Sequence, residues 1–451
     1  MTVHEVDVLM IGAGPANLAL AVAIEECGRS DLAGGAMILE QHEDVKWQRN
    51  LMLPWARSQV SYVKDLVTLR NPRSRFSFLN FMHERGELDE FVNLGTFNPF
   101  RWQVSAYLQW VADSLERVRV RYNARAERIL PIHSESGAVL GFTVPLSDGD
   151  TVLCRDLVVG GGRDAHVPEI FRGLPAERVV HSTEYSTRVA ATVELARPGK
   201  PLRPVVVGGA QSAAEMFMAL HEHAPGSSPT MLVRAIGLKD YQTSKFVNEL
   251  FFPSFVDEFF AMTDEARAKV LEEMHLTNYA GLAAPFLEEL YTMIYRQKML
   301  GQPVSTIRGL SEVVGARAAS LDGGGEELLL DVRDLKHGGI EQIRCDAVFL
   351  GTGFDSRMPS MVRGLAEAVG LETVTVNRQY RAELGREAHG ALYLQGVNEA
   401  THGISDSLIS VLAQRSADIV RDIVDRRATG AGPDGGRRTS GESVESVVVA
   451  A

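Results

Sequence analysis

Two stretches of the sequence share one order: a buried strand, a glycine turn and the start of a helix. One is residues 6–18, Val-Asp-Val-Leu-Met-Ile-Gly-Ala-Gly-Pro-Ala-Asn-Leu, and the other is residues 205–215, Val-Val-Val-Gly-Gly-Ala-Gln-Ser-Ala-Ala-Glu. Such a turn presents backbone N–H groups and a helix N-terminus to a phosphate. A single loop is a weak indication, because glycine turns also close ordinary strand–helix units. Two of them, about 200 residues apart, predict an α/β chain that binds two nucleotides.

The residues that end the next strands indicate which nucleotide each loop would hold. Residues 36–40 end in Glu40, 28 residues after Gly12, where a carboxylate accepts a hydrogen bond from the free ribose 2′-OH of FAD or NAD. Residues 230–234 end in Arg234, 26 residues after Gly208, and a planar guanidinium suits the 2′-phosphate of NADP. Each residue has a second interpretation, as a solvated charge at a strand end. Together they favour an NADPH-dependent flavoenzyme.

Composition narrows the class of protein. The 451 residues are 45% hydrophobic and 23% charged, which is typical of a globular chain with two or three domains. The net charge of −12 argues against nucleic acid or an anionic membrane as a partner. We expect neither a transmembrane helix nor a signal peptide, because no run of eighteen residues is apolar and the first ten residues contain two acids and no Lys or Arg.

The cysteines exclude further classes. Cys27, Cys154 and Cys345 lie far apart and form no Cys-x-x-Cys pair. The spacing predicts neither a disulfide framework nor a metal site, and it argues against the dithiol reductases, which also bind two nucleotides. We expect a cytoplasmic protein with reduced cysteines.

The order of elements predicts two Rossmann-like domains and a small, mostly helical substrate-binding insert. Alternating strands and helices occupy most of the chain, and this alternation stops after Arg234. The predicted organisation is an FAD-binding domain at 1–167 and 341–427, an NADP-binding domain at 168–340 with the insert at about 240–300, and a disordered tail at 428–451.

Three segments carry more specific expectations. Residues 47–72 follow no helical or strand period and contain Trp, Gln and Lys, which is typical of a segment that lines a pocket. The buried strand at 346–354 is expected to return to the first domain. A helix is expected to begin near Ser405 and to run to about residue 425.

Several motifs together resemble a known enzyme family. Either glycine loop alone is unspecific, but Phe-Val-Asn-Glu and Thr-Asn-Tyr at this separation, followed by a late Thr-His-Gly segment, are specific. The chain resembles the siderophore-type N-hydroxylating flavin monooxygenases, most closely the L-ornithine N-hydroxylases, up to about residue 425. The motifs are Gly12-Ala-Gly-Pro-Ala-Asn-Leu, Met52-Leu-Pro, Gln59-Val-Ser-Tyr-Val-Lys-Asp-Leu-Val, Gly209-Ala-Gln-Ser-Ala-Ala-Glu, Phe246-Val-Asn-Glu, Thr277-Asn-Tyr, Gly351-Thr-Gly-Phe and Thr401-His-Gly-Ile-Ser-Asp-Ser-Leu.

The resemblance implies roles for individual residues, and Asn278 is implied to lie closest to the chemistry. The implied FAD-binding residues are Gly12, Gly14, Pro15, Asn17, Glu40, Gln41, Trp47, Gln48, Gln59, Ser407, Leu408 and Ile409. The implied NADP-binding residues are Gly209, Ala210, Gln211, Ser212 and Arg234, with Asn278, Tyr279 and Ala280 near the nicotinamide. The implied substrate-binding residues are Lys64, Asn248, Glu249, Leu250, Phe251 and Ser410, and no metal is expected.

These roles are chemically reasonable. Lys64 is the one lysine of segment 47–72 and could pair with a substrate carboxylate, although an isolated lysine is more often solvated. Asn248 and Asn278 can each donate and accept hydrogen bonds, although an asparagine in a helical insert is more often a cap or a turn residue. A helix that begins near Ser405 could direct its positive N-terminal dipole at the flavin.

The resemblance also implies the reaction. NADPH reduces FAD, O₂ forms a C4a-hydroperoxyflavin, and the distal oxygen passes to the side-chain amine of L-ornithine. The amine must be neutral, whereas an ordinary ammonium has a pKa of about 10.4. Desolvation beside Leu250, Phe251 and Phe252 would lower that pKa. The family further implies a homo-tetramer and a role in the biosynthesis of a siderophore or a related natural product.

The sequence departs from the family pattern near the implied flavin and substrate. Gln48, Arg49 and Asn50 replace the usual His-Pro-Gly after Trp47, Trp55 and Ser58 replace the usual Gly and Met, and Phe252 replaces a small polar residue. Trp55 either shortens the pocket or packs outward. L-Lysine or a diamine is therefore an alternative substrate, although a diamine has no carboxylate for Lys64. Two other interpretations are an NADPH oxidase or flavin reductase that forms peroxide, and a nucleotide-binding protein without catalytic activity.

Overall fold

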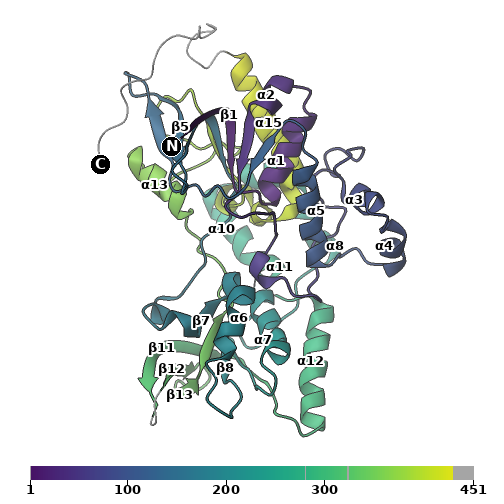
Figure 1. Ribbon diagram of the computed structural model, residues 1–451, viewed down its shortest axis with the longest axis vertical. Coiled ribbons are helices and arrows are strands. Elements are labelled where there is room, and N and C mark those ends of the chain that lie inside the picture. Colours follow the sequence, from purple (N-terminus) through teal and green to yellow (C-terminus); the bar gives the residue numbers. More distant parts are fainter. Residues whose placement is uncertain (1, 280, 322–324, 430–451) are drawn as a thin grey trace.

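The structure is a computed structural model that describes residues 2–279, 281–321 and 325–429. It has two lobes with helices between them (Figure 1). The upper lobe contains both the first strand and the last helix of the described chain, and the lower lobe contains the second glycine loop (Figure 1). Ala280 and residues 430–451 of the predicted tail lie outside the described residues.

The upper lobe is built on one sheet, in which seven strands pair within the described residues. Its central strands are parallel, whereas β5 pairs antiparallel with both β4 and β6. In spatial order the strands are β3 (Arg119–Arg121), β2 (Ala36–Leu39), β1 (Val3–Ile11), β6 (Thr151–Val159), β5 (Val139–Pro145) and β4 (Leu130–His133), and β15 (Leu392–Leu394) also pairs with β6. The helices of this lobe are α1 (Pro15–Glu26), α2 (Ser30–Gly34), α3 (Phe78–Glu84), α4 (Leu88–Leu94), α5 (Arg101–Asp113), α13 (Ser360–Ala368), α14 (Glu399–His402) and α15 (Leu412–Ala428).

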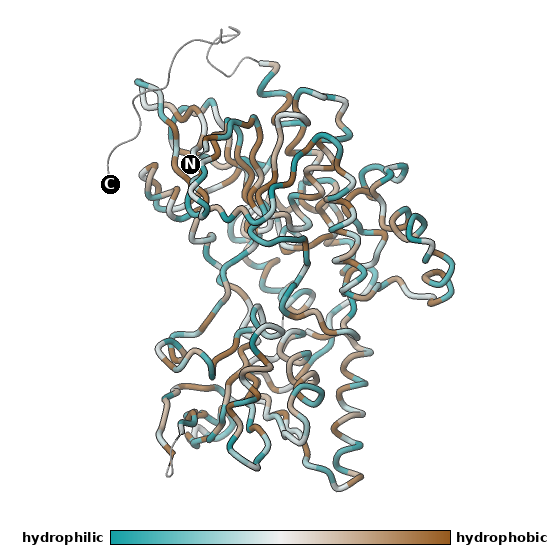
Figure 2. The backbone as a smooth tube through the Cα atoms, in the orientation of Figure 1, coloured by the Kyte–Doolittle hydropathy of each residue, from teal (hydrophilic) through white to brown (hydrophobic). Residues whose placement is uncertain are grey.

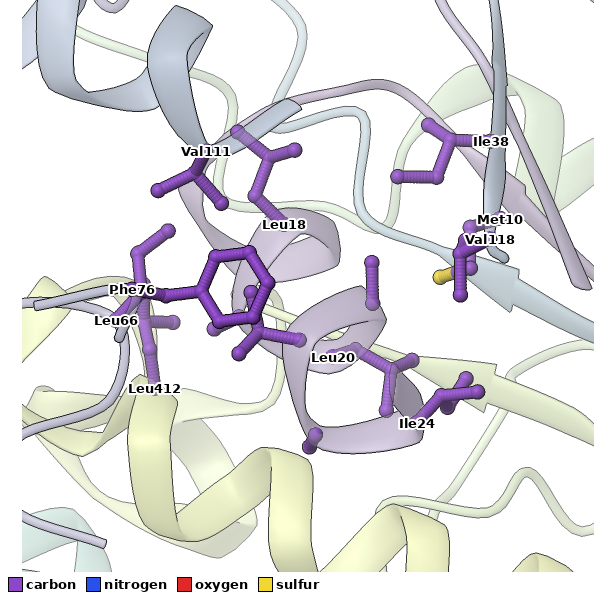
Figure 3. Packing of buried hydrophobic residues seen from close by; sticks show 14 of the residues in the cluster. Met10, Leu18, Leu20, Ile24, Ile38, Leu66, Phe76, Val111, Val118 and Leu412 are labelled. Carbon is purple, nitrogen blue, oxygen red and sulfur yellow. The ribbon is translucent and has the colours of Figure 1, made fainter. Parts of the chain in front are cut away.

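Helix α1 is the centre of the upper core. It carries no charge before its last two residues, and Leu18, Leu20 and Ile24 are fully buried. An α-helix that is apolar on all sides is stable only when it is covered on all sides. Strands β1 and β2, helix α5 and the late helix α15 provide that cover (Figure 3). Figure 2 shows the hydrophobic colour concentrated on the inner strands of this lobe.

The lower lobe contains a second sheet whose pairings are all parallel. Its strands, in spatial order, are β10 (Thr306–Arg308), β9 (Thr230–Leu232), β8 (Pro204–Val207), β14 (Ala347–Leu350) and β7 (Val179–His181). Helices α6 (Tyr185–Val193) and α7 (Gln211–His223) accompany this sheet. Two sheets with parallel central strands, each with a glycine turn after a buried strand, confirm the predicted α/β class with two Rossmann-like units.

One strand was predicted to belong to the wrong sheet. We expected the strand at 346–354 to return to the first domain, but β14 pairs with β7 and β8 of the second sheet. The chain therefore returns to the upper lobe only after Leu350. The predicted second part of the FAD-binding domain, residues 341–427, begins too early. Three strands before it form an unpredicted antiparallel sheet: β11 (Ser311–Ser320), β12 (Glu326–Asp334) and β13 (Ile340–Cys345).

The predicted insert is helical. Its helices are α8 (Lys245–Glu249), α9 (Pro253–Ala261), α10 (Asp264–Glu273), α11 (His275–Asn278) and α12 (Ala284–Met299). The helical path is interrupted between Asn278, where α11 ends, and Ala284, where α12 begins.

The last helix begins later than predicted. Instead of a helix from Ser405, the chain forms α14, the 3₁₀ turns Ile404–Ser407 and Ile409–Val411, and then α15 from Leu412. Gly403, with a φ of +82°, separates α14 from the first 3₁₀ turn. A long helix N-terminus is thus absent at Ser405, and so is the dipole that we expected there.

Candidate active site

The first glycine turn, between β1 and α1, is shaped by close backbone packing. Gly12 has a φ of +90°, and a Cβ there would lie 3.0 Å from Cα of Gly161, which follows β6. The Ala13 N–H donates to Oε2 of Glu40 at 2.9 Å, and the His42 N–H donates to Oε1 at 3.0 Å. The Glu40 carboxylate is therefore fixed beside the turn, and its remaining lone pairs can accept hydrogen bonds from a ribose.

Asn17 has a role that a glycine could not perform. It is fully buried, and its Nδ2 donates to the carbonyls of Ile11 and Gly12, both at 2.8 Å. Its Oδ1 accepts from Nε2 of Gln395 at 2.8 Å, and Oε1 of Gln395 accepts from Nε of Arg415 at 3.1 Å. The first turn is thus fastened to β15 and α15, which lie almost 400 residues later.

The late segment that completes this chain of contacts is also buried. Nη1 of Arg415 donates to Oδ1 of Asp406 at 2.8 Å and to its carbonyl at 2.6 Å. Nearby, His402 is 1% exposed and stacks on Tyr380 with 4.1 Å between ring centroids. Burial lowers the pKa of His402 to about 4, so the imidazole is neutral at pH 7.

The second glycine turn repeats the design of the first. Gly208 has a φ of +138°, and a Cβ there would lie 2.4 Å from the carbonyl oxygen of Gly351, which follows β14. Helix α7 begins without a side-chain cap at Ala210, as α1 does at Gly14. Because the first N–H groups of both helices lack a side-chain acceptor at the cap position, they are available to phosphate oxygens.

One cavity of about 2170 Å³ opens between these two turns. A volume of this size suits two nucleotides rather than one small ligand. The predicted cofactor residues that line it are Gly12, Gly14, Pro15, Glu40, Gln41, Trp47, Gln48, Gln59, Gly209, Ala210, Gln211, Ser212, Arg234, Tyr279, Ser407, Leu408 and Ile409. The structure also places Asn278 on the wall, whereas Asn17 lies behind the first turn and Ala280 lies outside the described residues.

The segment predicted to line a pocket, residues 47–72, does so only in its first half: residues 47–49, 57, 59 and 60 line the cavity, whereas none of residues 61–72 does. The Trp47 N–H donates to Oγ of Ser105 in α5 at 3.0 Å. Gln59 reaches the lower lobe, where its Oε1 accepts from the Tyr241 hydroxyl at 3.1 Å. Trp55 does not line the cavity but packs outward, which answers the question that the sequence left open.

Helix α11 forms the opposite wall. Asn278 is half-buried at the cavity, and Tyr279 follows it. The Tyr279 hydroxyl donates to Oε1 of Glu399 in α14, which connects the helical insert with the upper lobe. Burial, together with the nearby Glu399 carboxylate, raises the pKa of Tyr279, so the hydroxyl stays protonated.

The predicted substrate residues lie outside the cavity lining. Lys64 is half-buried, and it forms no ion pair with any described residue; burial lowers its pKa from the ordinary 10.5. Ser410 is 5% exposed, and its hydroxyl has no hydrogen-bond partner in the described part of the chain. A half-buried cation and an unsatisfied buried hydroxyl each suit a polar ligand.

The remaining substrate residues divide into two groups. Leu250 and Phe251 pack in one apolar cluster with Ile404 and Leu408, so the insert contacts the segment that lines the cavity. Asn248 and Glu249, in contrast, are exposed on α8.

Comparison with known proteins identifies the family. The family model described as L-lysine 6-monooxygenase/L-ornithine 5-monooxygenase matches residues 4–356. The L-ornithine N(5)-monooxygenase of Pseudomonas aeruginosa is 36% identical over 92% of each chain. The chain belongs to this monooxygenase family.

Solved structures agree with the family assignment. The ornithine hydroxylase PvdA from Pseudomonas aeruginosa superposes with a TM-score of 0.84 at 34% identity, over 94% of this chain and all of that one. The Kutzneria sp. 744 ornithine N-hydroxylase KtzI, in a structure with reduced FAD, NADP⁺ and L-ornithine, gives 0.83 at 30% identity over the same shares.

Sequence reasoning missed residues of this monooxygenase that lie far apart in the chain. Arg101 of α5 lines the cavity and forms a buried, two-pronged ion pair with Glu215 of α7, with distances of 2.8 and 3.0 Å. Gln395 and Arg415 also line the cavity. Nothing in the local sequence reveals such partners, although Glu215 stands in the second loop motif.

The residues fit a flavin and a nicotinamide nucleotide. The first turn offers N–H donors beside a fixed carboxylate, and the second offers N–H donors near Arg234, which is exposed at the cavity and forms no ion pair with the described residues. When bound, the two nucleotides supply reducing equivalents and oxygen activation. The residues of the protein would bind and orient the two nucleotides and shield them from water.

In residues 2–279, 281–321 and 325–429, no group of three or more His, Cys, Asp or Glu side chains is placed to hold a metal ion. In the same ranges, no helix combines the length and the apolar composition needed to cross a membrane.

Proposed function

We propose that the protein hydroxylates the side-chain amine of L-ornithine at the expense of NADPH and O₂, with FAD as its bound cofactor. The observation that carries the proposal is the pair of glycine turns that face one cavity, one beside Glu40 and the other beside Arg234. The names of the similar proteins, which are ornithine monooxygenases, support the same reaction.

We assign the two nucleotides to the two units. FAD would occupy the upper lobe, residues 1–167 and the chain after Leu350, and NADP would occupy the lower lobe with its insert. Asn278 would lie beside the nicotinamide, and Ser407, Leu408 and Ile409, where the two 3₁₀ turns meet, would lie against the flavin ring. The acid in one turn and the arginine near the other support this assignment, because a free 2′-OH and a 2′-phosphate demand opposite charges.

Arg234 provides a direct check of that assignment. The Arg234→Ala variant removes the guanidinium proposed to bind the 2′-phosphate, so its preference for NADPH over NADH should fall by about tenfold or more. Initial rates with each coenzyme measure this preference. Equal discrimination in parent and variant would contradict the position given to NADP.

The names of the similar proteins support ornithine as the substrate, and the residues that we assign to it lie beyond the cavity lining. Lys64 would bind the carboxylate, and Ser410 and Asn248 would bind the α-amino end. Leu250 and Phe251 would help to desolvate the side-chain amine and so favour its neutral, nucleophilic form. A diamine would leave the Lys64 ammonium without a carboxylate.

An amine panel tests the proposed reaction. L-Ornithine, L-lysine and a diamine are compared by the hydroxylamine formed per NADPH consumed. We expect the highest ratio with L-ornithine and slow NADPH consumption without any amine. A higher ratio with L-lysine or the diamine would contradict the substrate, and peroxide without hydroxylamine in every case would indicate an oxidase.

The wider setting is also a proposal. The family resemblance supports a cytoplasmic homo-tetramer whose product enters a siderophore or a related natural product. Light scattering after size-exclusion chromatography measures the assembly, and a mass other than four chains would contradict it.

A further inference from the structure

A short segment of the upper lobe is buried in the core of the lower lobe. Leu51, Leu53 and Ala56 are 5%, 2% and 2% exposed, and they belong to the same apolar cluster as Tyr185 of α6 and Phe217 of α7. The side chains before and after this segment, at positions 48 and 57, line the cavity between the lobes. The segment therefore connects the wall of the cavity with the packing of the second unit.

Within this segment, Trp55 forms both an aromatic stack and a side-chain hydrogen bond with the lower lobe. Its ring stacks on Phe286 with 5.7 Å between centroids and 16° between planes. Its indole N–H donates to Oε1 of Glu222 at the end of α7, at 3.2 Å. One side chain thus holds two helices of the lower lobe, and an offset aromatic stack contributes about 1 kcal/mol beyond its burial.

Helix α7 carries residues assigned to the nicotinamide nucleotide, and α12 follows other assigned residues in the chain. Phe286 lies in the first turn of α12, and the N–H of Ala283, just before that helix, donates to Oε1 of Gln211 at 3.2 Å. Gln211 begins α7, directly after the second glycine turn. Asn278 and Tyr279 precede α12 in the chain. Trp55 is therefore linked through few contacts to both walls of the proposed NADP site.

We propose that Trp55 is a positioning residue for hydride transfer. It fixes α12 and α7 against segment 49–56, and so it sets the place of the nicotinamide relative to the flavin. This role depends on the proposed function. Because reaction rates fall steeply with sub-ångström misplacement, a looser junction slows flavin reduction even when both nucleotides are bound.

The test compares Trp55→Ala with Trp102→Ala. Trp102 of α5 is a matched control, because it also stacks on a phenylalanine, Phe100, with 5.8 Å and 11°, but within the upper lobe. Stopped-flow bleaching of the flavin at saturating NADPH gives the limiting reduction rate. We expect about a tenfold loss for Trp55→Ala, a loss of less than about twofold for Trp102→Ala, and near-parent values for Trp55→Phe, which keeps the stack.

Each outcome has a separate meaning. A parent-like limiting rate in Trp55→Ala, with only a lower melting temperature, would show a purely structural residue and overturn the proposal. So would an equal loss in Trp55→Phe and Trp55→Ala, because the stack would then be irrelevant. A parent enzyme that NADPH does not bleach would contradict the proposed function and the role of Trp55 with it.

Discussion

Lys64 shows how much a single side chain can determine. It is half-buried without a carboxylate partner among the described residues, and burial lowers its pKa. A cation in this state gains free energy from any anion that reaches it. The sequence showed the lysine and its pocket-like segment, but only the structure shows that no described acid satisfies it.

Replacement of Lys64 by Met should therefore weaken the binding of the amino acid and leave the reaction with NADPH unchanged. Loss of a partly buried charge-assisted contact costs about 2–3 kcal/mol, so we expect the KM for L-ornithine to rise by about 30- to 150-fold. Flavin reduction by NADPH should remain within about twofold of the parent rate. Unchanged substrate saturation in the variant would remove the proposed carboxylate anchor.

The pH dependence of binding follows from the same group. The Lys64 ammonium is present below its lowered pKa and is lost as pH rises through it. As the pH rises, the affinity of the parent enzyme for L-ornithine should therefore decrease before the pH reaches 10.5. The Lys64→Met variant should not show this decrease. The variant separates the titration of Lys64 from that of the substrate amine.

Among the elements, β15 and α15 hold the first glycine turn in place. Gln395, the residue directly after β15, stands between Asn17 of the turn and Arg415 of α15, with hydrogen bonds of 2.8 and 3.1 Å. Tyr393 of β15 instead donates to Oδ2 of Asp422 at 2.6 Å. The strand and the residue that follows it thus provide two buried hydrogen-bonding side chains with different partners.

Gln395→Leu should weaken the retention of FAD. The change leaves Oδ1 of Asn17 and Nε of Arg415 buried without their partner, at a cost of about 1–3 kcal/mol for each group. We expect faster loss of flavin on dilution, measured by fluorescence of the released FAD. The control is Tyr393→Phe, which should lower the melting temperature but retain FAD; equal flavin loss in both variants would contradict the special role of Gln395.

At the same scale, some elements were predictable and others were not. The strand–turn–helix units around Gly12 and Gly208 were predicted within a few residues, because hydrophobic runs and glycines are local signals. Strand β14 was placed in the wrong sheet, because a buried parallel strand has the same apolar pattern in either sheet. The start of α15 was predicted too early, because the 3₁₀ turns after Gly403 resemble the first turns of a helix.

For the whole molecule, a buried ion pair is one of the contacts that join the two lobes. Arg101 is 4% exposed and Glu215 is 1% exposed, and Arg101 also donates to the carbonyl of Leu51 at 2.6 Å. The partners are 114 residues apart, so no local pattern could predict them. In the same way, the residues of the candidate site that belong to sequence motifs could be predicted. The residues that join one lobe to the other could not.

Removing one partner of this pair should destabilise the protein more than removing both. Arg101→Met leaves the Glu215 carboxylate buried and unpaired, which costs about 3–5 kcal/mol, whereas Arg101→Met with Glu215→Leu should recover most of that loss. Urea unfolding of the parent, both single variants and the double variant measures the coupling. A double variant as unstable as the sum of the single variants would show that the two side chains are independent.

The bond between Asn17 and Gln395 spans 378 residues and has a consequence for biosynthesis. A ribosome makes the first glycine turn long before it makes Gln395, which fastens this turn. During that interval the turn lacks its partner, so the nascent chain can bind a prosthetic group firmly only after Gln395 has been added and has folded against Asn17.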